Sequence, residues 1–315
     1  MSPNASAKFA LVLSLCLPGG FSMAAGENGS AGQGAGAAFF LSTDNEDFST
    51  RRAAVEYLPN FRHGDSLTGV RYTTHYFEQD DWTRHGHQLS LLHRDIDTAT
   101  ATGWQLEAGV FQQSGHELVM LDGGWRKLLA ERTGVELMIS RDWVETVTAL
   151  DRGIRYTFVG AAVDQGIGPH VTLIGLVGRQ EFSDDNFRNH GRFRIIVQPD
   201  LDLGLTLQAR FRAFTSARAD VDRAYFNPED FGEAMFVIGW RQRVEGWTVN
   251  SVIGTGRQKV SDAPHMPSHL LEIGLQSPVS RPYSLRLRGG INQSASFNGP
   301  NYRYRYLQAE LIIAF

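Results

Sequence analysis

Apolar and polar residues alternate with a period of two along most of the chain after residue 36. In LGLTLQARFRAF (203–214), every second residue from Leu203 to Ala213 is apolar, and Gly, Thr, Gln or Arg lies between them. RFRIIVQ (192–198) and YSLRLRGGIN (283–292) follow the same pattern. Such alternation predicts strands with one apolar and one polar face. No segment of the mature chain has a sustained helical periodicity, so we expect an all-β fold without helices.

The pattern predicts about sixteen strands, most of them about ten residues long. The predicted strands are residues 37–45, 50–58, 66–77, 83–94, 101–112, 116–127, 133–142, 151–162, 170–181, 190–198, 203–214, 233–244, 247–257, 268–277, 282–292 and 302–315.

The connections between these strands differ in length by parity. When the connections are numbered along the chain, the even-numbered ones include short turns such as Glu245-Gly246. The odd-numbered ones include the longer segments 183–191, 215–232 and 257–267. A soluble sandwich also shows alternation, but it has no reason to sort its loops in this way. Short periplasmic turns and long external loops are typical of outer-membrane barrels, which satisfy their backbone in lipid by closing. We therefore predict a transmembrane antiparallel β-barrel of about sixteen strands.

The N-terminal residues indicate export. Lys8 precedes the apolar run 9–17, which is followed by helix breakers and by small residues around Ala24. This is the order of a secretory signal peptide, and the run is shorter than the ~20 residues that a membrane-spanning helix needs. We expect a signal peptide at 1–24, a flexible Gly-rich linker at 25–36 and the barrel at 37–315. A lipoprotein at Cys16 is the alternative, although Leu15 occupies the position of a small residue.

Composition excludes several classes of function. The net charge of −4 gives no basic surplus for nucleic acid. The single cysteine supports neither a disulfide framework nor a cysteine metal site. No Gly-rich phosphate loop with Lys-Ser/Thr is present. We therefore expect no cofactor and no metal.

Three stretches carry a resemblance to a known family: STDNEDFSTRR (Ser42–Arg52), FSDDNFRNHGRFR (Phe182–Arg194) and AYFNPEDFGEAMFVIGWRQR (Ala224–Arg243). With the terminal phenylalanine of YLQAELIIAF (306–315), they resemble the barrels of bacterial exopolysaccharide-export proteins. Those are the C-terminal barrels of the cellulose-synthase C subunit and of the poly-N-acetylglucosamine export porin, and the related YaiO-like barrels. The resemblance implies a polysaccharide chain as cargo and recognition of the last strand by the barrel insertion machinery.

The large members of that family carry a helical tetratricopeptide-repeat region before the barrel, and here only the linker stands in that place. If the chain exports a glycan, it either does so without that scaffold or uses one from a separate periplasmic tetratricopeptide-repeat or synthase subunit. Outer-membrane lipid and lipopolysaccharide are the other expected partners.

Strand alternation assigns candidate residues to the lumen. Two interpretations stay open for the arginines: a wall that attracts anionic or hydroxyl-rich solutes, or ion pairs with inward glutamates that hold the barrel round. Tyr302, Tyr304 and Tyr306 could stack on sugar rings or belong to an interfacial girdle. The candidate arginines are Arg155, Arg194, Arg210, Arg212, Arg241, Arg243, Arg286 and Arg288, and the glutamates are Glu107, Glu136, Glu272 and Glu310.

The segment 215–232 is the longest expected external loop. Its Tyr225-Phe226-Asn227-Pro228 is aromatic and stiff, which favours a loop that folds into the mouth as a constriction. An ordinary surface loop is the alternative, because Pro228, Asp230 and Gly232 are common turn residues.

Histidines are concentrated in HGHQLSLLH, which holds His85, His87 and His93 close to Ser90. His85 and His87 share a strand face, but two histidines without a third ligand are a weak metal signal. Ser90 lies on the opposite face from His87, so the strand holds no nucleophile–base pair. We expect that the protein is not an enzyme. The leading hypothesis is an outer-membrane conduit or accessory for exopolysaccharide secretion; a general or solute-selective porin is the alternative, and a surface-modifying enzyme is the third.

Overall fold

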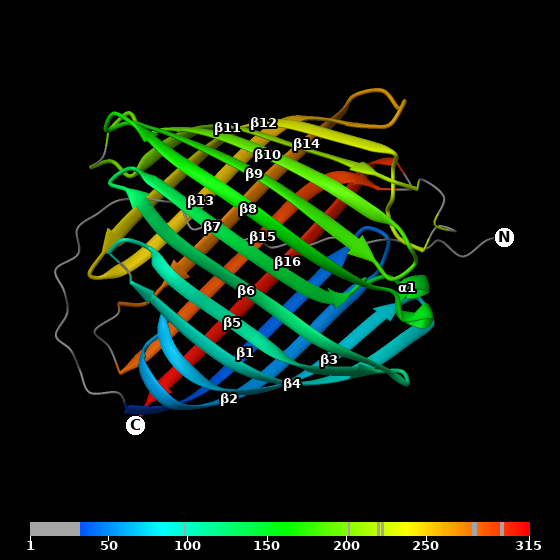
Figure 1. The fold of residues 1–315 in the computed structure, drawn as a ribbon, viewed down its shortest axis with the longest axis horizontal. Helices are drawn as coiled ribbons and strands as arrows, with labels where there is room; N and C mark the ends of the chain where they lie inside the picture. Colours follow the sequence, from blue (N-terminus) through cyan, green and yellow to red (C-terminus); the bar gives the residue numbers. More distant parts are fainter. Residues whose placement is uncertain are drawn as a thin grey trace.

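The computed structural model describes residues 32–97, 99–200, 202–218, 221, 224–278, 282–296 and 299–315. These residues form a closed antiparallel barrel of sixteen strands, in which each strand pairs with the next and β16 pairs with β1 (Figure 1). The predicted fold class and strand number are confirmed. The expected signal peptide and residues 25–31 of the expected linker lie outside the described residues. The strands are β1 (Gly32–Asp44), β2 (Ser49–His63), β3 (Ser66–Gln79), β4 (Trp82–Asp97), β5 (Thr102–Gln113), β6 (His116–Ala130), β7 (Thr133–Trp143), β8 (Arg155–Ile167), β9 (Val171–Phe182), β10 (Phe187–Val197), β11 (Leu205–Ser216), β12 (Asp230–Val244), β13 (Trp247–Val260), β14 (Met266–Gln276), β15 (Tyr283–Ser296) and β16 (Gly299–Ala314).

The barrel closes along the pairing of β1 with β16. Their register runs from Gly34 opposite Ala314 to Asp44 opposite Tyr304. β1 therefore begins at Gly32, within the segment expected to be linker, because the last strand needs a partner along its whole length. Beyond the paired residues, the amide of Phe315 donates to the carbonyl of Gln33 at 2.9 Å.

The outer face of the barrel is apolar and exposed. Leu91 is 65% exposed, Val177 68% and Phe236 53%. The residues that alternate with them point inward and include buried polar side chains such as Ser90 and Gln180. An apolar outer face around a polar interior is the arrangement of a barrel that spans lipid.

The loop lengths follow the predicted parity only in part. Two long connections, 144–154 and 217–229, lie at the end of the barrel away from Gly32 and Phe315. The expected long loops 183–191 and 257–267 are wrong, because β10 already begins at Phe187 and β13 continues to Val260. Pairing with β9 and β12 extends these strands into segments whose composition is typical of turns. We call the end with the two long connections the outer end.

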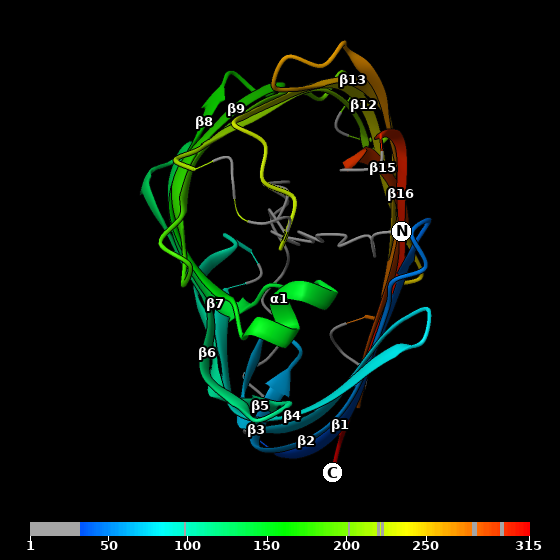
Figure 2. The ribbon, with the colours of Figure 1, turned by 90° about the vertical axis from the view of Figure 1, so that its right-hand side faces the viewer.

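A short helix corrects the expectation of a helix-free chain. α1 (Val147–Arg152) occupies the connection between β7 and β8, where a strand was predicted to begin at residue 151. Its N-cap Thr146 accepts a hydrogen bond from the amide of Ala149, and Gly153 ends it in the left-handed conformation with φ of 65°. In Figure 2, which views the outer end, α1 lies inside the oval outline of the barrel.

Within the described residues, no helix has the length and apolar character that crossing a membrane would require.

Candidate functional site: the lumen

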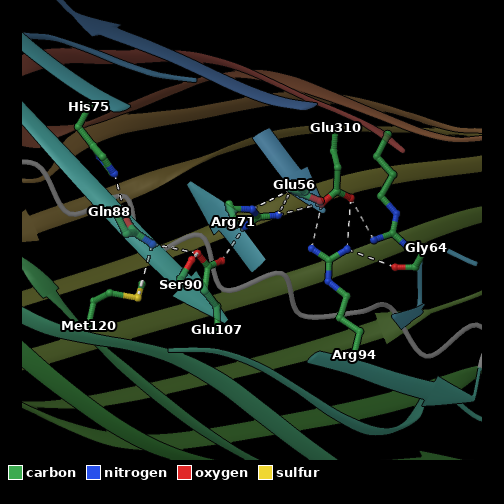
Figure 3. A network of polar contacts seen from close by, with 11 residues as sticks. Glu56, Gly64, Arg71, His75, Gln88, Ser90, Arg94, Glu107, Met120 and Glu310 are labelled. Atoms are coloured by element: carbon green, nitrogen blue, oxygen red, sulfur yellow. Dashed lines mark hydrogen bonds and ion pairs between the residues drawn. The ribbon is translucent and has the colours of Figure 1, made fainter. Parts of the chain in front are cut away.

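A network of charged side chains fills one side of the lumen (Figure 3). Arg71 of β3 lies at its centre. Its Nε donates to Glu56 of β2 at 2.7 Å, and its Nη1 donates to Glu107 of β5 at 2.6 Å. Its Nη2 reaches Glu310 of β16 at 3.3 Å. One guanidinium thus connects three carboxylates from three other strands.

Glu310 extends this network toward the end of the barrel that carries Gly32 and Phe315. Arg94 of β4 donates to both carboxylate oxygens of Glu310, at 3.0 and 3.2 Å. Arg286 of β15 lies 3.6 Å from Glu310 and donates to Asp65 at 2.6 Å. These are the ion pairs that the sequence offered as the alternative for inward arginines.

Neutral side chains complete the network on β3 and β4. Glu107 accepts hydrogen bonds from Ser90 Oγ at 2.7 Å and from Gln88 Nε2 at 2.9 Å. The amide oxygen of Gln88 in turn accepts from His75 Nε2 at 3.1 Å. Because its carboxylates are matched by cations and donors, this side of the lumen offers little unsatisfied charge to a solute.

A second group of charges lies on the wall formed by β10 and β11 and has a different character. Arg192 is the cross-strand partner of Arg212, and Arg194 is the partner of Arg210. All four share the inward face with the buried Ile196, whereas Phe193 and Phe211 are exposed on the outer face. Like charges directly opposite each other destabilise a sheet. We call Arg192, Arg194, Arg210 and Arg212 the basic wall.

Carboxylates neutralise only part of the basic wall. Arg212 makes a two-point contact with Glu233 of β12, at 2.6 and 3.1 Å. Arg210 donates to the neutral Gln208 at 3.0 Å. Within the part of the chain that the structure describes, Arg192, Arg194 and Arg210 form no ion pair. Glu272 is held elsewhere, by Arg288 at 2.7 Å and by the hydroxyl of Tyr306 at 2.6 Å. The wall therefore presents a net positive surface to the lumen.

Acidic side chains lie on a different arc of the lumen. Glu107 of β5, Asp122 of β6 and Glu136 of β7 share the inward face through the pairs Glu107–Asp122 and Arg126–Glu136. Asp122 is exposed to the lumen. Arg71 neutralises Glu107, and Arg126 of β6 pairs with Asp164 at 2.9 Å. This arc therefore holds charges of both signs, whereas three guanidinium groups of the basic wall form no ion pair among the described residues. A charged solute that enters the lumen is drawn to one wall.

The outer mouth is narrowed by packed loops. Tyr225 is fully buried and stacks on Phe182 with ring centroids 4.5 Å apart. It belongs to a buried cluster with Ala149 and Ile154, on and next to α1. Thr146 Oγ1 donates to the carbonyl of Ala224 at 2.6 Å, which ties the 217–229 loop to the N-cap of α1. The predicted constriction segment thus lies against α1 at the mouth.

The buried Arg188 and polar side chains hold this loop in place. Arg188 Nη2 donates to Asn227 Oδ1 at 3.1 Å and to the carbonyl of Phe226. Asn186 Nδ2 donates to the hydroxyl of Tyr225 at 3.0 Å, and that hydroxyl donates to Asp184 at 3.1 Å. Burial raises the pKa of the Tyr225 hydroxyl above its ordinary value, so the hydroxyl remains a donor at neutral pH.

No protein-family model matches the chain, and no curated protein matches its sequence. Among solved structures, a bacterial polysaccharide outer membrane secretin is similar over 91% of this chain and 100% of its own, with a TM-score of 0.64 and 10% sequence identity. The chain folds as an outer-membrane β-barrel. OccK5 (OpdH) from Pseudomonas aeruginosa covers 91% of this chain and 98% of its own at a TM-score of 0.44 and 11% identity. OprD from Pseudomonas aeruginosa covers 90% of this chain and 94% of its own, at a TM-score of 0.44 and 12% sequence identity.

The barrel places most of the predicted arginines inward but corrects one of them. Arg155 shares a face with Val159 and Val163, which are exposed on the outside, so it does not line the lumen. The prediction was wrong because both faces of β8 are apolar here, with Phe158 and Ala162 buried on the inner face, so alternation did not separate lumen from lipid. Arg241 and Arg243 point inward near the turn between β12 and β13 and are exposed. Arg286 and Arg288 point inward and are ion-paired.

The predicted tyrosines also point inward. Tyr304 and Tyr306 stack with ring centroids 5.9 Å apart, and Tyr302 donates to Asp44 at 3.0 Å. Their inward position excludes the girdle interpretation, which requires contact with the lipid interface.

Several residues of the lumen were missed. Arg192 has the same period-two signal as Arg194 and could have been found by it. The same signal was present at Arg71, Arg94 and Glu56. Arg71 and Arg94 both reach Glu310 on β16, which is distant in sequence.

The histidines lie on the outer face. His87 stacks on Tyr72, with its Nδ1 2.8 Å from the tyrosine hydroxyl, and His93 lies against Trp104. Ser90 points inward to Glu107, opposite to His87 as predicted. Among the described residues, no three His, Cys, Asp or Glu are grouped to hold a metal ion.

Proposed function

We propose that the barrel is an outer-membrane conduit for secretion of an exopolysaccharide that carries carboxylate or other anionic groups. The basic wall is the observation that supports this proposal. Arg192, Arg194 and Arg210 face the lumen without an ion pair among the described residues, although placing arginines opposite each other costs stability. A guanidinium donates several hydrogen bonds in a fixed geometry that matches carboxylates and hydroxyl groups.

The basic wall suits a chain that must pass through. Conduction requires contacts that attract the cargo and yet release it. Arginines two residues apart along β10 and β11 offer successive equivalent contacts instead of one deep site. The structurally similar secretin is described as a polysaccharide outer membrane protein, which agrees with the same cargo class. The driving force would come from a partner such as a periplasmic or synthase subunit.

A solute-selective porin is the second candidate, because the same arginines would attract small anions equally well. The two candidates differ in the size of the cargo. Catalysis is not part of the proposal, since the clustered His85, His87 and His93 lie on the lipid side.

Secretion by a strain that lacks the gene tests the proposal. We expect the deletion to lower secreted anionic polysaccharide, and the wild-type gene to restore it. The double variant Arg192→Gln with Arg194→Gln should restore it only partly. A matched control, Arg303→Gln with Arg305→Gln, removes two charges at the same spacing from the outer face of β16 and should restore secretion fully. Undiminished secretion in the deletion strain would reject the polysaccharide role in favour of the porin.

A further inference from the structure

A band of cations surrounds part of the barrel at its outer end, on the face that points away from the lumen. Arg257 and Lys259 of β13 and Arg303 and Arg305 of β16 are exposed there. We call these four residues the outer-rim cluster. They lie on the outer face because they alternate with inward residues such as Gln258 and Tyr304.

The sheet register places these cations on the same part of the rim, with β14 and β15 between the two pairs. Arg303 is paired with Gln293 of β15, which is paired with His269 of β14. His269 lies two positions from Pro267, the partner of Arg257. Neighbouring strands lie about 4.8 Å apart, so the cation pairs on β13 and β16 lie about 14 Å apart on the same part of the rim, and the exposed His269 lies between them.

Acidic side chains do not neutralise this patch. Within the described ranges, none of the four cations forms an ion pair. On the opposite side of the rim the pattern differs, because Arg179 pairs with Glu181 at 2.9 Å and lies over the ring of Phe187.

The patch adjoins the lipid-facing surface directly. The outward side chains one or two positions closer to the middle of the strands are apolar and 41% to 60% exposed: Ile253, Leu271, Ile291 and Leu307. A ligand that fits both surfaces has an anionic head and apolar chains.

We propose that the outer-rim cluster binds the phosphate groups of a lipid in the outer leaflet. Arginine and lysine bind phosphate strongly, and exposed charges attract over a range of about 8 Å at physiological salt. The lipid chains would lie along the apolar face of β13–β16. This surface is separate from the lumen, so the inference does not depend on the proposed cargo.

Binding of a phosphorylated lipid to the full-length barrel in detergent tests the inference. The probe is bisphosphorylated lipid A, compared by native mass spectrometry with dephosphorylated lipid A carrying the same acyl chains. We expect the phosphorylated form to be retained at least about tenfold more tightly. Equal retention of the two forms by the wild-type protein would overturn the proposal.

Matched variants locate the site. Arg303→Gln with Arg305→Gln should weaken retention about tenfold, whereas Arg192→Gln with Arg194→Gln, on the inner face, should leave it unchanged. Equal effects of both pairs would contradict a site on the outer rim. Free inorganic phosphate distinguishes the source of the anion: we expect millimolar phosphate not to displace the lipid. Full displacement would mean that the cluster binds free phosphate and not a lipid headgroup.

Discussion

At Glu310, guanidinium groups from β3, β4 and β15 converge on one carboxylate. Glu310 is 8% exposed, so its charge depends on these partners for solvation. Breaking a buried ion pair by removing one partner costs more than the pair contributes, because an uncompensated charge remains. The network therefore holds strands β2 to β5 and strands β15 and β16 in one arrangement.

We expect Glu310→Gln to lower the free energy of unfolding by about 3 kcal/mol, at the lower end for a buried pair because the Arg94 side chain is 20% exposed. Urea unfolding of the barrel refolded in lipid vesicles measures this change. Gln308→Ala, on the same strand and the same face but exposed, is the control and should change stability by less than about 0.5 kcal/mol. Equal stability of the Glu310 and Gln308 variants would contradict the structural role of the network.

The outer mouth is an assembly of two elements, α1 and the 217–229 loop. Neither has a core of its own, and each buries its apolar side chains against the other and against Phe182. Trp143 and Leu150 also anchor the helix to Phe111 on the inner face of the barrel. The two connections therefore act as one cap, whose position depends on Tyr225.

We expect Tyr225→Ala to release the cap and to raise the single-channel conductance. Removing a buried aromatic ring costs about 3 kcal/mol, which is enough to detach a loop of this size. Tyr225→Phe keeps the ring and loses the hydrogen bonds to Asn186 and Asp184, so its conductance should stay close to wild type. Unchanged conductance in the alanine variant would mean that the cap does not narrow the path.

Around the whole barrel, the outer face of each strand contacts lipid, whereas the inner face contacts the lumen. On β16, Leu307 faces outward and is 49% exposed, whereas Gln308 faces the lumen. Placing a charge on the lipid side costs about 2–4 kcal/mol near the middle of the bilayer, but a charge in the lumen stays hydrated.

Leu307→Arg should therefore destabilise the barrel by about 2 kcal/mol, the lower end of this range because Leu307 lies one outward position from Arg305 of the outer rim. The adjacent Gln308→Arg should have little effect. Unfolding of both variants in lipid vesicles provides the comparison. If the two arginines cost the same, the assignment of the faces would be wrong.

The strands were predictable because period-two alternation is local and recurs in every strand. Leu203 to Ala213 needed no knowledge of distant residues to be placed on one face. α1 was not predictable from periodicity, since six residues are too few to show it, although Thr146 and Gly153 carry its capping signals. The pairing of Arg71 with Glu310 joins residues far apart in the chain and depends on barrel closure, which no local pattern encodes.

The ion selectivity of the open barrel tests the central claim most directly. Reversal potentials across a salt gradient in planar bilayers should show a preference for anions in the wild-type protein. Arg192→Gln with Arg194→Gln should shift the reversal potential toward zero, while Arg303→Gln with Arg305→Gln should leave it unchanged. A cation-selective wild type, or a lumen variant that keeps the wild-type potential, would contradict the account of the basic wall.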